Sequence, residues 1–188
     1  MVLNNLIQQK LIEESIKQEI EQTLSLRAQR YLKVKPHEII PYKHFSPASA
    51  ECPLLFRDGH YYGCITLAQS VAEAIVRFLC QKNSWKAEKD FKNNVNTLFN
   101  RNFISEKLKS KFLEIWKNRD DYHHLKQNIE VQRIKLEEIS CEKVLLLKEI
   151  ESEIFKFSFD KVGKLIPKNR KYWELQENGT IPAFLRFE

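Results

Sequence analysis

Six consecutive residues past the middle of this chain combine three kinds of side chain that handle protons and phosphates. They read Arg119-Asp120-Asp121-Tyr122-His123-His124. An imidazole takes up or releases a proton near neutral pH. A guanidinium binds a phosphate and stabilises the charge that develops on it. These groups are sufficient for metal-independent RNA cleavage, in which the ribose 2′-hydroxyl loses its proton, attacks its own phosphate and leaves a 2′,3′-cyclic phosphate.

The spacing of these residues matters if they lie on a helix. A helix advances about 100° per residue, so Arg119 and His123 share one face and His124 is displaced around the axis. Asp120 and Asp121 stand four and three residues before His124, and either carboxylate could orient its imidazole. The segment therefore predicts a compact site on the last turn of a helix.

That helix is predicted to begin after Ser105, a plausible N-cap, and to run to about Leu125. Its apolar line contains Leu108, Phe112, Ile115, Arg119 and Tyr122. A guanidinium on an apolar line is costly to desolvate unless it is paired or used. The structural alternative is an ordinary ion pair of Arg119 with Asp120, Asp121 or Glu73, with both histidines at a solvated helix end.

A second helix, predicted over residues 60–82, has the strongest core pattern in the chain. Its broad apolar stripe consists of Ile65, Ala68, Val71, Ala72, Ile75 and Leu79. Glu73 lies on another face of the same helix. The small residues of the stripe would let a neighbouring helix approach closely.

The motif late in one helix, preceded by a polar segment and an alanine-containing core helix, resembles the HEPN superfamily in its ribonuclease form. Arg119 matches the family arginine, and Asp120 matches the polar position after it. His124, with four intervening residues, matches the family histidine, and His123, with three, is the second choice. Glu73 matches the acidic residue that the core helix often supplies.

The resemblance covers roughly residues 60 to 155 and implies an all-α, HEPN-like bundle of four or five helices. It also implies a homodimer with two motifs across one cleft, and RNA cleavage as a toxin or an antiviral-defence effector. An antitoxin or a nucleotidyltransferase would then be a partner, although Lys126 stands where some such toxins carry the tyrosine modified by that transferase. A non-catalytic module that binds nucleotides, RNA or proteins is the alternative, and no cofactor is implied.

The rest of the chain divides into segments of different character. Residues 1–34 predict an amphipathic helical arm that packs on the body or on a partner, and a helical scaffold protein would use this arm. Residues 35–59 hold four of the six prolines and predict a connector. Residues 60–160 form the predicted bundle, and residues 161–188 form a basic and aromatic tail.

Finer features complete the prediction. Residues 83–103 predict a polar loop with a short helix near 88–99, and residues 128–158 predict a long helix with a possible break near Ser140. Asn178-Gly179 between apolar runs predicts a β-hairpin, with Pro182 on an edge strand. The tail residues predicted to contact the RNA backbone are Lys164, Lys168, Arg170 and Lys171.

Composition sets broad limits on these interpretations. The chain has 188 residues, 43% hydrophobic and 30% charged, and 31 basic less 25 acidic side chains give a net charge of +6. Such a basic excess fits an anionic partner or a solvated lysine-rich surface. Four cysteines without a C-x-x-C pair predict reduced, mostly buried thiols, and a zinc site of Cys52, His60 and Cys64 matches no strong pattern. Without a leader pattern or a run approaching ~18 apolar residues, we expect a cytoplasmic protein that does not enter membranes.

Overall fold

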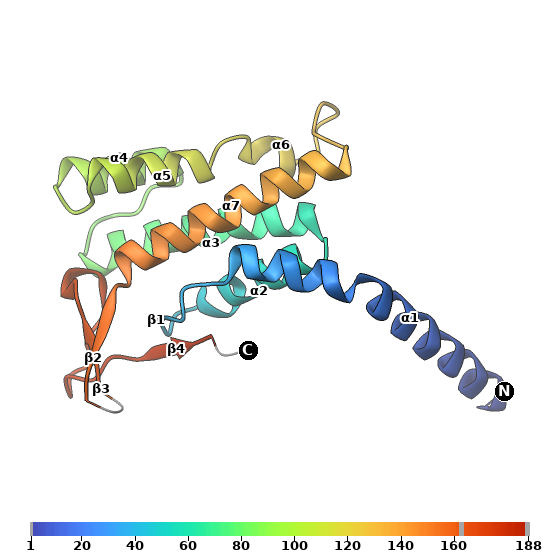
Figure 1. Cartoon of the computed structure of the whole chain (residues 1–188). Helices are drawn as coiled ribbons and strands as arrows, with labels where there is room; N and C mark the ends of the chain where they lie inside the picture. The colour runs from blue at the N-terminus through green and yellow to red at the C-terminus, as the bar shows by residue number, and fades with distance from the viewer. Residues whose placement is uncertain (1, 162–163, 187–188) are drawn as a thin grey trace.

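Helices make up most of the chain, and two small sheets accompany them (Figure 1). The computed structural model describes residues 2–161 and 164–186, apart from the side chains of residues 2–4, 161 and 164. Its elements are, in chain order, α1 (Val2–Val34), β1 (Ile39–Pro41), α2 (Ser46–Arg57), α3 (Tyr61–Lys82), α4 (Phe91–Asn100), α5 (Glu106–Ile115), α6 (Arg119–His123), α7 (Arg133–Ile154), β2 (Phe157–Lys161), β3 (Lys164–Pro167), the 3-10 turn η1 (Arg170–Tyr172) and β4 (Ala183–Leu185). The prediction of a mostly α-helical fold is confirmed.

Helix α3 is the centre of the bundle, and α2, α4, α5, α6 and α7 all contact it. The apolar stripe predicted from its sequence is the face that is buried. Ala68 and Ala72 are fully buried within it, so their small side chains leave room for α7, which runs beside α3 along its length (Figure 1). Burial of this stripe removes apolar surface from water and so stabilises the fold.

The expectation that no stretch approaches a membrane span in length and apolar composition is wrong for α3. Among the described residues, α3 alone is long and apolar enough to cross a membrane by length and composition, with a mean hydropathy of 1.4 in its best window. However, 61% of that window is buried inside the bundle. A core helix passes the same test as a membrane span, and the burial of α3 explains its apolar composition.

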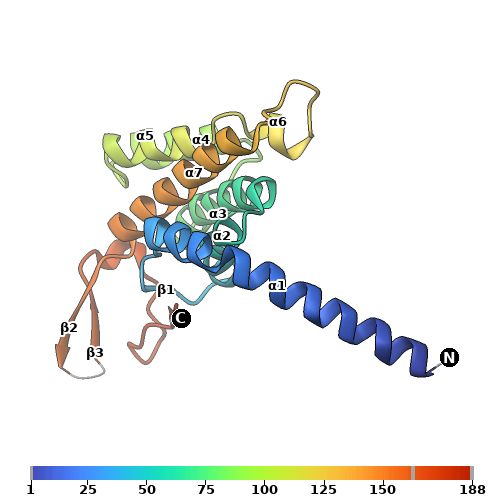
Figure 2. The same ribbon diagram turned by 45° about the vertical axis from the view of Figure 1, so that its right-hand side comes forward.

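Helix α1 ends at Val34, as the predicted arm does, and only its last part lies against the body. There Arg27 is 3.6 Å from Asp58, and Arg30 donates to Glu137 at 2.7 Å. The remainder projects away from the bundle in both views (Figures 1 and 2).

The proline-rich connector predicted for residues 35–59 is wrong in its second half, because α2 occupies 46–57. Pro47 stands in the first turn of α2, where a missing backbone donor leaves no hydrogen bond unmade. Pro53 lies inside the helix, at a site where proline ordinarily costs about 3 kcal/mol. Cys52 and Phe56 are fully buried on the same helix, and their packing offsets that cost.

Helices α4 and α5 begin at side-chain caps. The Asp90 carboxylate accepts a hydrogen bond from the backbone N–H of Asn93 at 2.8 Å. The Ser105 hydroxyl accepts one from the N–H of Leu108 at 3.1 Å, which confirms the predicted cap. The short helix expected near 88–99 is present as α4.

The single helix predicted from Ser105 to about Leu125 is wrong, because it is broken into α5 and α6. Helix α5 ends at Ile115, and Asn118 adopts a left-handed backbone with φ of 61° before α6 begins. Asparagine tolerates this conformation better than most residues. Trp116 stacks on Phe91 with ring centroids 4.1 Å apart, and this contact fixes the chain at the break. Arg119 therefore starts a new helix and does not continue the apolar line of α5.

Helix α7 is shorter than the predicted 128–158 and has no break near Ser140. The Ser140 hydroxyl donates to the Glu137 carbonyl within the helix at 3.0 Å, so it does not interrupt the chain. Residues before Arg133 form a loop, where the Tyr62 hydroxyl donates to the Glu130 carbonyl at 2.8 Å.

The hairpin predicted around Asn178-Gly179 is wrong in place. These residues make a tight turn, with Gly179 at φ of 77° and the Gln176 N–H donating to the Thr180 carbonyl at 2.9 Å, but no strand precedes it for β4 to pair with. The hairpin of the tail is β2–β3, and β4 instead pairs antiparallel with β1. The Asn-Gly residues specify the turn, but they do not specify which strand β4 pairs with. That partner is β1, whose Ile39 and Ile40 are buried and lie far away in the sequence.

Three of the four cysteines are buried, as predicted, and all four are free thiols. Burial raises the pKa of Cys64 to about 12, and it also raises the pKa of Cys52. The Cys64 thiol faces the Cys52 carbonyl at 3.5 Å. Within the described ranges, no group of three or more His, Cys, Asp and Glu side chains could hold a metal ion.

Candidate active site

Helix α6 carries the motif and is held between two left-handed residues. Asn118 precedes it, and Leu125 follows it with φ of 46°, a conformation that leucine rarely adopts. The buried Gln69 side chain of α3 donates to the carbonyls of Ile115 and Lys117, at 3.1 and 3.2 Å. These carbonyls lack helical partners at the break, so Gln69 fixes the point from which α6 starts.

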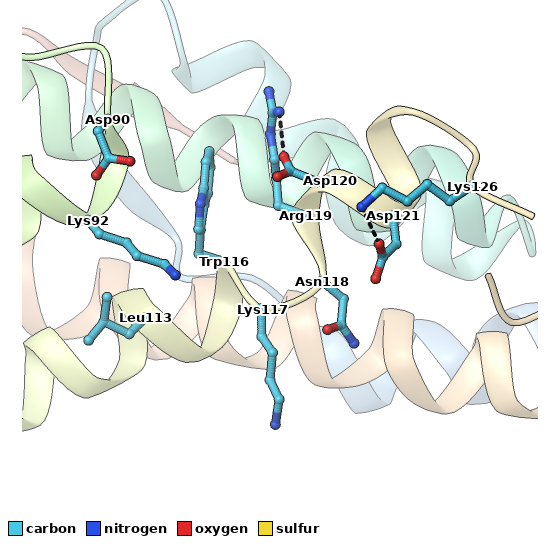
Figure 3. A pocket seen from close by; sticks show the side chains of 10 residues that line it. All are labelled: Asp90, Lys92, Leu113, Trp116, Lys117, Asn118, Arg119, Asp120, Asp121 and Lys126. Atoms are coloured by element: carbon cyan, nitrogen blue, oxygen red, sulfur yellow. Dashed lines mark hydrogen bonds and ion pairs between the residues drawn. The ribbon is translucent and has the colours of Figure 1, made fainter. Parts of the chain in front are cut away.

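Arg119 lies at the start of α6, with two partners in its own neighbourhood. Its guanidinium is 5.3 Å from the centre of the Trp116 ring and donates to Asp120 at 3.0 Å, as drawn in Figure 3. Its Nε atom is buried and has no hydrogen-bond partner within the described residues. The ion pair with Asp120, one of the structural alternatives for Arg119, is therefore present.

Asp120 is exposed and serves as the counter-charge of Arg119. The hydrogen bond from Arg119 lowers the pKa of the Asp120 carboxyl, which is therefore ionised at neutral pH. Asp121 pairs instead with Lys126 at 2.9 Å. The two carboxylates are thus each bound to a cation and neither makes a described hydrogen bond to an imidazole.

The two histidines occupy different environments. His123 is half-buried, and its Nε2 atom is covered and has no hydrogen-bond partner in the described part of the chain. Burial lowers the pKa of His123, and the charges of Arg119 and His124 lower it further, so this imidazole is neutral at pH 7. His124 caps α6 and is exposed, and its backbone N–H donates to the Asp120 carbonyl at 3.2 Å.

Glu73 reaches the motif across the contact between α3 and α6. Its charge raises the pKa of His123, against the larger effect of burial, which places the carboxylate within electrostatic range of the imidazole. Its hydrogen-bond partner, however, is Arg77 one turn later on α3, at 2.7 Å. Glu73 therefore acts on His123 only through the charge of its carboxylate, and its hydrogen bond is to Arg77 on its own helix.

The motif divides two surface hollows. One, of about 660 Å³, contains the Arg119 side chain, and the other, of about 510 Å³, is lined by His123 with Tyr62 and Tyr122. Besides Arg119, the charged side chains that line the first hollow are three lysines and three aspartates (Figure 3): Lys92, Lys117, Lys126, Asp90, Asp120 and Asp121.

Sequence reasoning missed these three lysines and the role of Gln69. Lys117 and Lys126 flank the motif closely in sequence, and that proximity was an available signal. Lys92 and Gln69 reach the site only through the packing of α4 and α3, for which a single sequence carries no signal.

The basic tail lies at the other end of the bundle from α6 (Figures 1 and 2). The 22 residues of α7 separate the two regions, which corresponds to about 33 Å of helix. Lys168 and Arg170 are exposed, whereas Lys171 donates to the Phe103 carbonyl at 2.7 Å. Lys164 lies on β3, and its side chain is outside the described residues. RNA contact by the tail stays a prediction.

Comparison of the chain with protein-family models, with curated proteins and with solved structures finds no match. The likeness to HEPN proteins therefore rests on the motif and its helical setting.

Proposed function

We propose that this chain is a metal-independent endoribonuclease of the HEPN type that acts as a homodimer. One observation supports the proposal most: a guanidinium and a neutral half-buried imidazole on α6, and an exposed imidazole at its C-terminal cap, lie beside a hollow lined by three lysines and three aspartates. Such a set can bind a phosphate and move protons without a cofactor.

The proposed reaction uses each group at a stated atom. The His124 imidazole takes the proton of a ribose 2′-hydroxyl, and the 2′-oxygen attacks the adjacent phosphorus. Arg119 leaves Asp120 to bind the phosphate oxygens and stabilise the negative charge of the transition state. The bond from phosphorus to the 5′-oxygen then breaks, and an imidazolium returns a proton to that oxygen. The products carry a 2′,3′-cyclic phosphate and a 5′-hydroxyl.

The imidazolium that returns the proton to the 5′-oxygen is His124 itself or the partner's His124. His123 is neutral at pH 7, because burial lowers its pKa, so it would be an alternative acceptor of the 2′-proton once its Nε2 is uncovered. Exposed His124 is free to meet a second copy of the motif. We assign the main role to His124, with Asp120 and Glu73 orienting the site through their charges.

A path for the RNA backbone follows from the placement of lysines. Lys92, Lys117 and Lys126 line the hollow beside Arg119, and Lys126 is paired with Asp121. Lys111 and Lys148 line a further hollow between α5 and α7, toward the tail, where Lys111 is paired with Glu149 and Glu153. An RNA bound along this side would reach exposed Lys168 and Arg170 about one length of α7 away.

The test is cleavage of mixed RNA by the purified full chain in EDTA. We expect 2′,3′-cyclic phosphate ends, and a loss of about 10²–10³-fold in rate for Arg119→Ala, the range measured when one transition-state donor is removed. His124→Ala should lose at least as much. His123→Ala then shows whether the second imidazole takes part.

A matched control is Arg101→Ala, because Arg101 also lies over a tryptophan ring, Trp85, at 4.7 Å. It should retain full activity with the same circular dichroism as the wild type. Cleavage that requires a divalent metal, or that survives in both Arg119→Ala and His124→Ala, contradicts the proposal.

A second function is favoured by one observation: Arg119 is already engaged by Asp120 and Trp116. A site whose arginine is held by its own neighbours fits a non-catalytic module that binds RNA or nucleotides. This alternative predicts RNA affinity that falls with Arg119→Ala, without cleavage at any protein concentration. If cleavage is found, growth arrest on expression in a host would separate a toxin from a defence effector that needs activation.

A further inference from the structure

Two apolar surfaces of this chain have no partner within it. The first is the arm, which we define as residues 2–24 of α1. The large aliphatic side chains along it are between 40% and 66% exposed; they are Leu6, Ile7, Leu11, Ile12, Ile16, Ile20 and Leu24. Exposed apolar patches larger than roughly 300–600 Å² are uncommon on monomers and mark interaction sites.

The second surface is the end patch, which we define as Leu125, Val131 and Ile134. These side chains are 67%, 74% and 77% exposed. They lie on the loop after α6 and on the first turn of α7. Tyr62, itself on the surface, binds this loop through its hydroxyl.

The arm leaves the body at the end where the patch lies. Arg30 of α1 and Arg133 of α7 both approach Gly59, and Arg133 directly precedes Ile134. Beyond this point α1 is an unbroken helix that points away from the bundle in both views (Figures 1 and 2). A straight arm cannot fold back onto the patch of its own chain.

The two surfaces also carry opposite charge. The arm has two lysines and four glutamates, a net charge of −2. Residues 124–135, which carry the patch, have two lysines, one arginine and one glutamate, a net charge of +2, which falls to +1 when Asp121, the partner of Lys126, is included. Opposite fields steer two such surfaces together and disfavour the pairing of two arms.

We propose that two copies of this chain exchange arms, each arm covering the end patch of the other copy. The 23-residue arm is about 34 Å long, enough to cross a partner domain. Because each chain gives one arm and receives one, the contact closes as a twofold dimer. Stable dimers bury about 800 Å² per partner, and in this arrangement each copy would contribute both its arm and its end patch to that area. Leu125 directly follows His124, so the partner's arm would also lie beside the candidate site.

The test is sedimentation equilibrium of the full chain, with no RNA present, and it therefore stands apart from the proposed nuclease activity. The wild type should have twice the 22.4 kDa mass of one chain. An arm variant, Ile16→Asp with Ile20→Asp, and a patch variant, Val131→Asp with Ile134→Asp, should each dissociate at least 10-fold more readily. Gln81→Asp, at an exposed position on α3 outside both surfaces, is the control and should remain dimeric.

Mixing the two variants distinguishes arm exchange from other pairings. The arm variant keeps an intact patch and the patch variant keeps an intact arm, so a 1:1 mixture should regain a dimer through one contact. A patch variant that dimerises like the wild type shows that arms pair with each other and overturns the proposal. A monomeric wild type, or no regain on mixing folded variants, overturns it as well.

Discussion

Among the described residues, six buried side-chain polar atoms lack hydrogen-bond partners, and two of them, Arg119 Nε and His123 Nε2, belong to α6. An unsatisfied buried polar group costs about 1–3 kcal/mol, and native proteins carry few of them. Both atoms belong to the motif that sequence alone singled out. Their presence on one five-residue helix is the residue-scale reason to regard α6 as a functional segment.

Stability should fall as the pH drops below neutrality, because burial lowers the folded-state pKa of both His37 and His123. Above about pH 6.5, the usual pKa of histidine, folded and unfolded states are both neutral. Below it the unfolded state binds protons more readily, so the free energy of unfolding decreases until the folded pKa is passed. Urea denaturation at pH 7.5, 6.5, 5.5 and 5.0 measures this decrease.

Carboxylates do not explain a decrease in the free energy of unfolding between pH 7.5 and 5.0. Glu137 and Asp58 have lowered pKa values, so their contribution is lost only as the pH falls below about 4.5. His37→Gln and His123→Gln should each flatten the profile between pH 7.5 and 5.0. A profile unchanged in both variants would refute the assignment.

At the scale of elements, the break between α5 and α6 decides where Arg119 points. The break is stabilised from outside by Gln69 of α3 and by Lys143 of α7, whose ammonium donates to the Glu114 carbonyl at 2.7 Å. A helix that continued through residue 118 would place Arg119 on the line of Leu108 and Phe112. Because of the break, Arg119 instead begins a new helix beside the hollow that Lys92, Lys117 and Lys126 line.

Gln69→Ala should therefore lower the free energy of unfolding by about 1–3 kcal/mol, because two buried carbonyls lose their donor. RNA cleavage, if the proposed function holds, should fall with it at temperatures where the variant is folded. Thermal denaturation and cleavage assays measure the two effects. Gln81→Ala, at an exposed position near the end of the same helix, is the matched control and should change neither. Equal stability of the two variants would contradict the role of Gln69.

At the scale of the whole molecule, the tail is attached to the body by a buried ion pair. Arg186, after β4, donates to Glu151 of α7 and to Ser49 of α2, both at 2.8 Å. The charged side chains are 3% and 1% exposed. The pair and the β1–β4 sheet together connect the tail to α2, α7 and the segment after α1.

Arg186→Ala should destabilise the fold by about 3 kcal/mol or more, because it leaves the Glu151 charge buried without its cation. For a chain of this size, that corresponds to a decrease in Tm of about 6–12 °C. Differential scanning calorimetry measures it, with exposed Arg170→Ala as the control. A decrease in Tm no larger than the control's would show that the tail is held by its backbone pairing alone.

The sequence by itself determined the helical class, the core helix, the long N-terminal helix, the cap at Ser105 and the burial of most of the cysteines. These features follow from periodicity, side-chain volume and local hydrogen bonding, which act within a few residues along the chain. It also identified Arg119, Asp120 and His123 as neighbours on one helical turn.

The tertiary structure alone decided the features that depend on distant residues. Pro47 and Pro53 predicted a connector, but the burial of Phe56 against the bundle makes that segment a helix. The break before Arg119 requires Gln69, 46 residues from the carbonyl of Ile115 that it binds. Strand β4 pairs with β1, which lies near the other end of the chain, and does not pair with a strand on the other side of the Asn178-Gly179 turn. In each case the observed structure is stabilised by contacts between segments that a single sequence does not show to be adjacent.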